Sequence, residues 1–367
     1  MKIAIVHDYL NQYGGAERVV EVLNEMFPDA PIFTSIYLKD RMPSIFRSMD
    51  IRVSFMQKFP FLKKHFKKYL LFYPKAIESL NLKGFDLIIS SSSAFAKGVI
   101  PVKGACHICY CYAPMRFVWD YNNYIKNENF DKLTLKILML TVSRLKKWDL
   151  KSNKRVNYFI AISKNIKNKI NNFYSREADY IYPPVECSKF NISDKTEDYF
   201  LIVSRLNAYK NIDLVIKSFN HTNLKLKIVG TGPYKDQLIN MCTNKNIEFL
   251  NKVSDEDLKN IYSRCRAFIF PGEEDFGIAP LEAQASGRPV IAYAAGGALE
   301  TIIENETGIF FRENTLNSFD KAIEEFLRKE DAFNPETIRQ NALKFDKEIF
   351  KSNFKNSVLQ KYKEFLS

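Results

Sequence analysis

Residues 271–283 read PGEEDFGIAPLEA and directly follow the apolar residues 267–270, AFIF. The apolar run predicts a buried strand, and Gly277 would begin a helix whose first backbone N–H groups can meet a phosphate. Glu282 would lie within this helix, separated from Glu274 by seven residues. A carboxylate there is suited to gripping two ribose hydroxyls, and the alternative is a carboxylate satisfied by its own helix terminus. The segment therefore predicts a strand, a loop and a helix that suit a phosphorylated ligand.

Short apolar runs and longer helical patterns alternate on both sides of this segment. Residues 16–27, 255–263 and 346–366 carry apolar side chains at helical spacing. The predicted strands are residues 3–6, 86–90, 106–112, 159–162, 178–182, 199–203, 225–229, 247–250, 267–270, 289–293 and 308–311. This alternation is typical of the α/β class, in which helices cover both faces of parallel sheets.

The length of 367 residues suits two domains rather than one. After Pro183-Pro184, residues 186–198 are polar and without periodicity, which predicts a linker. We therefore expect an N-terminal domain over residues 1–185, a C-terminal domain over 186–345, and a final helix over 346–367 that returns to the first domain. Two similar halves suggest a cleft between them, with ligands beyond the carboxyl ends of the strands.

Composition narrows the class of protein less than the motifs do. The net charge of +12 suggests an anionic partner, yet a chain rich in Lys, Asn and Ile can be basic without binding one. No nucleic-acid motif is found. No apolar run reaches the ~20 residues of a membrane span, and the first apolar run is too short for a signal peptide. We therefore expect a cytoplasmic protein with reduced cysteines, and a buried strand rather than a metal site at Cys106 and Cys109.

Loops that follow predicted strands carry the other candidate residues. Arg205 and Lys210 lie five residues apart after residues 199–203, where a planar guanidinium and a mobile ammonium could clamp a diphosphate. Two solvated basic residues are the alternative. Four glycines in such loops would let a ligand approach the backbone closely, or would serve as ordinary turns: Gly14, Gly15, Gly230 and Gly232.

Together these motifs resemble the retaining nucleotide-sugar glycosyltransferases of family 4, which have the GT-B fold of two Rossmann-like domains facing each other across a cleft. The motifs that carry the resemblance are Gly14-Gly15, Ser204-Arg205-Leu206 with Lys210, Gly230-Thr231-Gly232-Pro233, Glu274-x7-Glu282, and Gly296-Gly297. Finer features resemble the bacterial O-antigen mannosyltransferase branch: His7-Asp8-Tyr9, residues 110–116, and Tyr182-Pro183-Pro184-Val185.

The resemblance implies a role for each candidate. Arg205 and Lys210 correspond to the pair that neutralises the leaving diphosphate, Glu274 to the ligand of the donor-sugar hydroxyls, and Glu282 to the ribose ligand. The remaining implied donor contacts are Gly14, Gly15, Gly230, Gly232, Phe276, Gly277 and Ile278. The family works without a metal and without a resident cofactor, since the nucleotide sugar is its substrate.

One position departs from the family pattern. Where related chains have a histidine after a Tyr-Cys pair, this chain has Tyr112. Tyrosine can hydrogen-bond there but carries no positive charge at neutral pH. His107 precedes it by five residues, and an odd spacing on a strand places the two on opposite faces. Tyr112 is therefore the candidate catalytic residue of the first domain, in a role that the departure leaves open.

Residues 55–74 combine aromatic and basic side chains. Apolar residues recur every three or four positions, and lysines stand between them: Lys63, Lys64, Lys67 and Lys68. This pattern predicts an amphipathic helix, with Phe59 and Phe66 on the apolar face. Such a helix either lies on an anionic membrane or packs on the core of its own protein. We favour the membrane because the resemblance implies a lipid-linked acceptor.

The expected function is transfer of a hexose, with retained configuration, to a lipid-linked or polysaccharide acceptor of the cell surface. The resemblance favours mannose from GDP-mannose, and a position at the inner face of the cell membrane. Two other hypotheses stay open. One is the same reaction with a UDP-linked sugar, and the other is a non-catalytic binding protein of the same fold. The Asp255-x-Asp257 sequence could suggest a metal, but a capped helix start enriched in acids explains it more simply.

Overall fold

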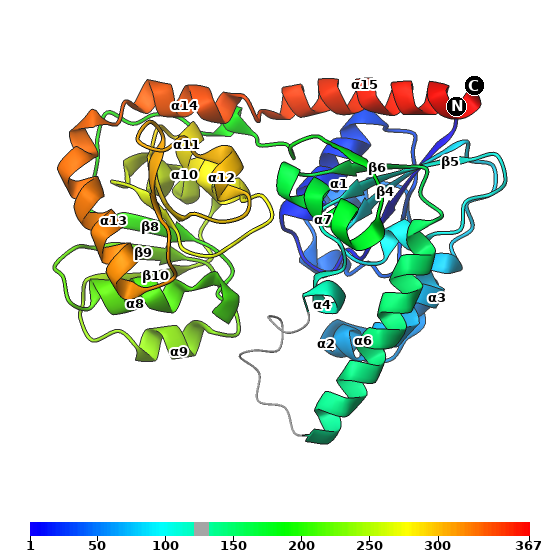
Figure 1. Ribbon diagram of the computed structural model, residues 1–367, viewed down its shortest axis with the longest axis horizontal. Helices are drawn as coiled ribbons and strands as arrows, with labels where there is room; N and C mark the ends of the chain where they lie inside the picture. The colour runs from blue at the N-terminus through cyan, green and yellow to red at the C-terminus, as the bar shows by residue number, and fades with distance from the viewer. Residues whose placement is uncertain (121–131) are drawn as a thin grey trace. The chain divides into compact units, whose positions relative to one another are not determined.

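Two parallel β-sheets organise the chain, one in each of two units (Figure 1). The structure is a computed structural model and describes residues 1–120 and 132–367. The first unit comprises Met1–Tyr182 and Phe350–Ser367, and the second comprises Pro183–Ile349. The divisions predicted from the sequence are at 185/186 and 345/346.

The first sheet has seven strands in the order β3-β2-β1-β4-β5-β6-β7, and all neighbours are parallel. Its strands are β1 Ile3–His7, β2 Ile32–Thr34, β3 Ile51–Val53, β4 Leu87–Ser92, β5 Cys106–Cys111, β6 Tyr158–Ala161 and β7 Ala178–Tyr180. From β1 the chain winds outward to β3, and from β4 it winds the opposite way. The boundary between β1 and β4 is therefore the point where the winding reverses, which in such sheets is the place of ligand sites.

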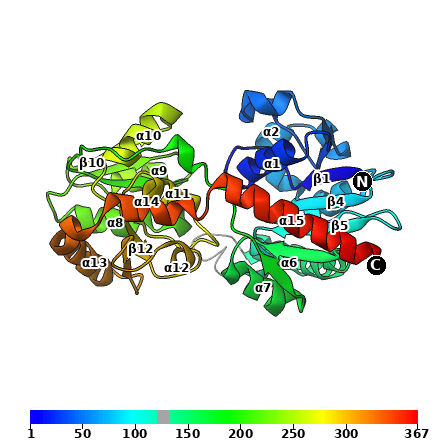
Figure 2. The same cartoon turned by 90° about the horizontal axis from the view of Figure 1, so that it is seen from above.

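Helices cover both faces of this sheet because its strands are buried on both sides. On one face Val6 and Ile88 pack with Ile77 of α3 (Tyr73–Glu78). On the other, Tyr110 contacts two phenylalanines of α15 (Lys347–Leu366), which runs across the strands in Figure 2. The other helices of four or more α-helical residues described in this unit are α1 Gly15–Met26, α2 Leu62–His65, α4 Arg116–Trp119, α6 Lys132–Asn153 and α7 Lys164–Tyr174.

The second sheet has six parallel strands in the order β10-β9-β8-β11-β12-β13. Its strands are β8 Phe200–Val203, β9 Leu226–Val229, β10 Ile247–Asn251, β11 Phe268–Phe270, β12 Val290–Tyr293 and β13 Gly308–Phe311. The winding reverses between β8 and β11. The predicted GT-B class, with two Rossmann-like units, is confirmed by these two sheets.

Alternating residues of β11 illustrate how this sheet is covered. Ile269 joins the core formed with α8 and α13, whereas Phe268 contacts Tyr262 of α10 on the other face. The helices described in this unit are α8 Ile212–Phe219, α9 Lys235–Asn240, α10 Asp255–Arg264, α11 Ile278–Ala285, α12 Ala298–Thr301, α13 Leu316–Lys329 and α14 Pro335–Leu343. Across residues 1–120 and 132–367, no helix combines the length and apolar character needed to span a bilayer.

The prediction of one amphipathic helix over residues 55–74 is wrong. The segment divides into a 3₁₀ turn at Phe55–Lys58, α2, a kinked 3₁₀ stretch at Phe66–Phe72, and the start of α3. Pro60 has no N–H to extend a helix, and Phe61 adopts a left-handed backbone conformation with φ of 51°. The break changes which aromatic residues point outward, because Phe59 and Phe66 pack against the unit's own core.

Two other motifs are placed in ordinary structural surroundings. Cys106 and Cys109 lie buried in β5, and burial raises the pKa of the Cys106 thiol to about 11. Asp255 and Asp257 begin α10, where the Ser254 hydroxyl caps the helix by accepting from the Asp257 N–H at 3.1 Å.

Candidate functional site

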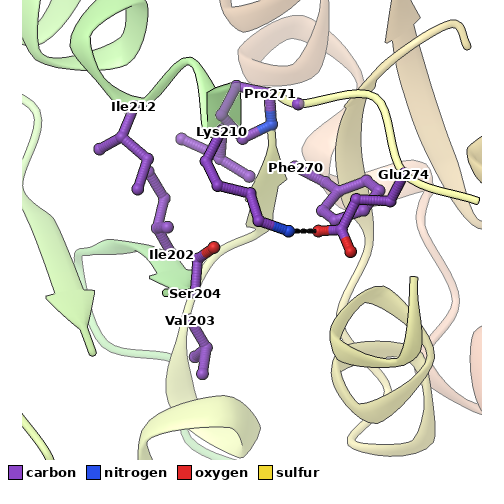
Figure 3. Close-up of a pocket in the computed structure, with 10 residues that line it drawn as sticks. Ile202, Val203, Ser204, Lys210, Ile212, Phe270, Pro271 and Glu274 are labelled. Carbon is purple, nitrogen blue, oxygen red and sulfur yellow. Dashed lines mark hydrogen bonds and ion pairs between the residues drawn. The ribbon is translucent and has the colours of Figure 1, made fainter. Parts of the chain in front are cut away.

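The winding of the second sheet reverses where two charged side chains meet. Lys210 ends a 3₁₀ turn after β8, and Glu274 lies in the loop after β11. The Lys210 ammonium donates to the Glu274 carboxylate, and Figure 3 shows the two side chains pointing toward each other. The fold therefore joins residues 64 positions apart at the carboxyl end of the sheet, where a Rossmann-like sheet binds its ligand.

The pair closes one side of a small pocket. Apolar side chains of β8, α8 and β11 also line it, among them Ile202, Ile212 and Phe270 (Figure 3). Its volume is about 10 Å³, room for about one water molecule. The Lys210 side chain is 11% exposed and that of Glu274 is 28% exposed. Because the two charges neutralise each other, an anion can reach the ammonium only by displacing the carboxylate.

Arg205 is not brought into this pair. It is exposed, and among the residues that the structure describes its guanidinium has no hydrogen-bond or ion-pair partner. The loop that carries it is nevertheless tightly held. Gly230 has φ of 140°, and a Cβ there would lie 1.8 Å from the Ser204 carbonyl oxygen. A Cβ on Gly232 would lie 2.2 Å from the Leu206 carbonyl oxygen. The two predicted glycines therefore brace the residues on both sides of Arg205.

The loop that carries Glu274 is supported in the same way by two glycines, Gly296 and Gly297, which entered the prediction only through the family resemblance. The Gly297 N–H donates to the Glu274 carbonyl oxygen at 2.8 Å, and a Cβ on Gly297 would lie 2.2 Å from the Phe276 backbone. Gly296 approaches the Glu274 carbonyl equally closely. Their place after β12, at the same end of the sheet, is the signal that could have revealed them.

The residues predicted as backbone contacts begin α11. Gly277 is its N-cap residue, with φ of 91°, and Ile278 is its first helical residue. The Phe276 side chain is buried against Phe345. It is thus the backbone of residues 276–278, rather than the Phe276 ring, that lies at the start of the helix.

Glu282 lies deeper in α11 and is 6% exposed. Its Oε2 accepts a hydrogen bond from the Tyr262 hydroxyl at 2.9 Å. Tyr262 comes from α10 and is fully buried. Sequence reasoning missed this partner because nothing in the spacing of the two residues brings α10 beside α11. This hydrogen bond engages one of the two carboxylate oxygens of Glu282.

The candidate residues of the first unit gather at the reversal of its own sheet. Gly14 caps α1, with its N–H donating to the Glu17 carboxylate at 2.8 Å. Tyr112 follows β5, and its hydroxyl lies 2.8 Å from the Ser91 Oγ and 3.2 Å from the Ala16 carbonyl oxygen. Burial raises the pKa of Tyr112 well above its ordinary value, and the nearby carboxylates of Glu17 and Asp8 add to this effect. The hydroxyl therefore remains protonated at neutral pH.

A known protein family matches the second unit of this chain. Residues 186–345 match the family described as glycosyl transferases group 1. This part of the chain resembles a group 1 glycosyl transferase domain. Lys210, Glu274 and Glu282 all lie within the domain. The resemblance to glycosyltransferases that the sequence predicted is confirmed.

Curated relatives of this chain include bacterial and archaeal proteins. An uncharacterized glycosyltransferase of Methanocaldococcus jannaschii is 25% identical over 52% of this chain and 54% of its own. The O-antigen chain mannosyltransferase RfbU of Salmonella typhimurium is 31% identical over 38% of this chain and 43% of its own. The chain thus spans about half the length of the curated relatives that it matches.

Solved structures share the fold over nearly the whole chain. Sucrose-phosphate synthase of Thermosynechococcus elongatus has a TM-score of 0.76, with 98% of this chain and 99% of that chain covered. HepE of Anabaena, in complex with UDP, has a TM-score of 0.72, with 98% and 100% covered. Both are 15% identical to this chain, so the likeness is one of fold.

Proposed function

We propose that the protein is a retaining glycosyltransferase that moves a hexose, mannose from GDP-mannose, to a lipid-linked or polysaccharide acceptor. The observation that carries this proposal is the Lys210–Glu274 pair at the reversal of the sheet in the group 1 domain. A cation for a diphosphate and a carboxylate for hydroxyls are the two chemistries that a sugar nucleotide requires. The mannosyltransferase relatives favour mannose, whereas the UDP complex of HepE keeps a UDP-linked sugar as the second candidate.

The reaction needs charge stabilisation rather than a strong base. The bond between the anomeric carbon and the diphosphate oxygen breaks, and the acceptor oxygen bonds to that carbon from the same face. The acceptor proton passes to the leaving phosphate oxygen. Lys210, Arg205 and the N-terminus of α11 offset the negative charge that grows on the diphosphate. Glu274 holds donor-sugar hydroxyls, and the proposal requires neither a metal nor a resident cofactor.

A screen of nucleotides tests the proposal. The purified protein is heated with GDP, UDP, ADP and their sugars, because a ligand present at 100 times its Kd stabilises the native state by about 2.7 kcal/mol. Release of nucleoside diphosphate from GDP-mannose is then followed in the presence of a mannose-accepting glycolipid. Stabilisation without turnover for every sugar nucleotide would instead identify a non-catalytic binding protein.

Glu282→Ala should raise the KM for the donor by about 10- to 100-fold and change kcat little. A ribose contact is made equally before and during transfer, so its loss weakens binding uniformly. A hydrogen bond to a charged group contributes about 1.5–3 kcal/mol, which sets the range. Steady-state kinetics with varied donor measures it.

Tyr262→Phe is the matched control for this variant. It removes the hydrogen bond between α10 and α11 and keeps the Glu282 carboxylate. We expect a lower melting temperature in both variants but a raised KM in Glu282→Ala alone. An unchanged donor KM in Glu282→Ala would show that Glu282 serves only the packing of α11.

The proposed lipid-linked acceptor requires the protein to reach a membrane, and a basic, aromatic surface of the first unit offers the means. Phe61 is 77% exposed although aromatic rings are usually covered. Leu71 and Phe72 are each 47% exposed. Exposed lysines lie in the same segment, at Lys63, Lys64 and Lys68. Charge and apolar surface together suit an anionic bilayer, and the inserting residues are Phe61, Leu71 and Phe72 instead of Phe59 and Phe66.

Replacing Lys63, Lys64 and Lys68 with glutamine should release the protein from anionic vesicles. Each lysine near such a surface contributes about 1 kcal/mol, so the three together correspond to roughly a hundredfold in binding. Sedimentation with phosphatidylserine vesicles at low salt is the measurement. The matched control changes Lys164, Lys167 and Lys169 of α7 to glutamine, which removes the same charge elsewhere on the unit. If the control and the variant lose binding equally, net charge rather than this surface is responsible.

A further inference from the structure

Four elements of the first unit bring polar side chains together where the winding of its sheet reverses. His7 is the last residue of β1, Ser91 lies in the neighbouring β4, and Tyr112 follows β5. Glu17 comes from the first turn of α1. His7 is 2% exposed and Glu17 is 3% exposed, so the cluster is shielded from water.

The contacts of one imidazole nitrogen set the direction of the hydrogen bonds. The His7 Nδ1 lies 3.1 Å from the Ser91 carbonyl oxygen and 2.9 Å from the Ser91 Oγ. A carbonyl oxygen can only accept, so we assign the hydrogen to Nδ1. Ser91 then accepts from His7 and donates to the Tyr112 oxygen at 2.8 Å. The Tyr112 hydroxyl is left to donate to the Ala16 carbonyl oxygen at 3.2 Å.

The other imidazole nitrogen faces the helix start. The His7 Nε2 lies 3.7 Å from Glu17 Oε1, and Glu17 Oε2 accepts from the Gly14 N–H at 2.8 Å. The other carboxylate of this region is committed elsewhere: Asp8 accepts from the Ser93 hydroxyl and from four backbone N–H groups of residues 93–96. With its hydrogen on Nδ1, His7 has none at Nε2 to donate to Glu17, so Glu17 holds the glycine loop through Gly14 and His7 acts through Nδ1.

We infer that His7 is a positioning residue of the transfer reaction, which orients the Tyr112 hydroxyl through Ser91. The inference rests on the proposed function, because Tyr112 matters only if the first unit contributes to the reaction. Hydrogen-bond chains in a dry interior polarise and orient one another. The His7 imidazole thus fixes, through Ser91, the orientation of a hydroxyl that follows a different strand.

The same strand provides a matched control for the Ser91 hydroxyl. Ser90 lies on the opposite face of β4, and its Oγ is 2.8 Å from Nε2 of the fully buried His107. Ser91→Ala and Ser90→Ala each remove one buried serine–histidine hydrogen bond of similar length. We expect Ser91→Ala to lower kcat about tenfold with little change in donor KM. Ser90→Ala should lower only the melting temperature.

Two further sets of variants separate positioning from stability. Tyr112→Phe and the double variant Ser91→Ala/Tyr112→Phe should show the same kcat, because both interrupt one relay, whereas independent residues would give multiplied losses. His7→Asn places an amide N–H near the position of Nδ1 and should restore kcat relative to His7→Ala.

Kinetics on the whole set, with circular dichroism of each variant, decide the outcome. Equal kcat values in Ser91→Ala, Ser90→Ala and the wild type overturn the inference while leaving the proposed function intact. Multiplied losses in the double variant also overturn it. A wild-type protein that transfers no sugar from any nucleotide of the panel overturns the proposed function, and the role of His7 in transfer with it.

Discussion

Lys210→Ala should lower turnover about 10²- to 10³-fold while the protein remains folded. Negative charge on the leaving diphosphate grows as the glycosidic bond breaks, and loss of one group placed to stabilise such charge typically has an effect of this size. Lys210 is placed to do so because the loop after β8 holds it at the reversal of the sheet, against Glu274. The loss should fall on kcat more than on the donor KM, since the interaction strengthens in the transition state.

Lys217→Ala is the control for this experiment. Lys217 belongs to α8, seven residues later, and pairs with Asp213 on the surface at 3.1 Å. Both variants remove one lysine from the same region of the same unit. Turnover should be unchanged in Lys217→Ala. Near-normal turnover in folded Lys210→Ala would mean that the ammonium does not meet the diphosphate, and the proposed mechanism would have to be abandoned.

Asp149→Ala should lower the free energy of unfolding of the first unit by about 3–5 kcal/mol. Asp149 is fully buried in α6, and its Oδ1 lies 2.6 Å from the Lys97 ammonium. Its Oδ2 accepts from the Trp119 indole at 2.7 Å and from the Tyr174 hydroxyl at 2.8 Å. Removing one member of such a pair leaves a buried charge without compensation.

Tryptophan fluorescence in urea measures this effect in the first unit alone, because both tryptophans of the chain, Trp119 and Trp148, belong to it. Asp213→Ala, which breaks an exposed pair in the other unit, should leave the first unit's unfolding unchanged. The double variant Lys97→Met/Asp149→Leu should recover much of the stability, since it removes both charges together. A loss below about 1 kcal/mol in Asp149→Ala would show that water or other residues compensate Lys97.

The alternation of apolar runs predicted most of the strands but not two at one edge of the first sheet. β2 and β3 each have three residues, too few to establish a period of two. The longer runs around β8 and β11 were recognisable because strands buried on both faces are continuously apolar. The single helix predicted over residues 55–74 is absent although the apolar residues have helical spacing. Pro60 and Phe61, whose backbone is left-handed, interrupt it.

The candidate site was predictable where one short segment holds several of its parts. The loops after β8 and β11 could be named from their position after strands, which is why Lys210 and Glu274 were expected in one site. Contacts between distant segments could not be predicted in this way. Tyr262 beside Glu282, and His7 beside Ser91 and Tyr112, depend on how helices and strands pack. Periodicity says which face a residue occupies, but not which residue lies opposite.

The contribution of α15 to the first unit bears on how the protein is made. Phe350 and Phe354 complete the aromatic packing around Tyr110, and Lys361 pairs with Asp179. A ribosome synthesises residues 183–349 between these two parts of one core. Domains generally fold from the N-terminus during synthesis. The Tyr110 face of the first sheet, however, stays uncovered until α15 has been synthesised. Expression of residues 1–182 alone would leave that apolar face permanently open to aggregation.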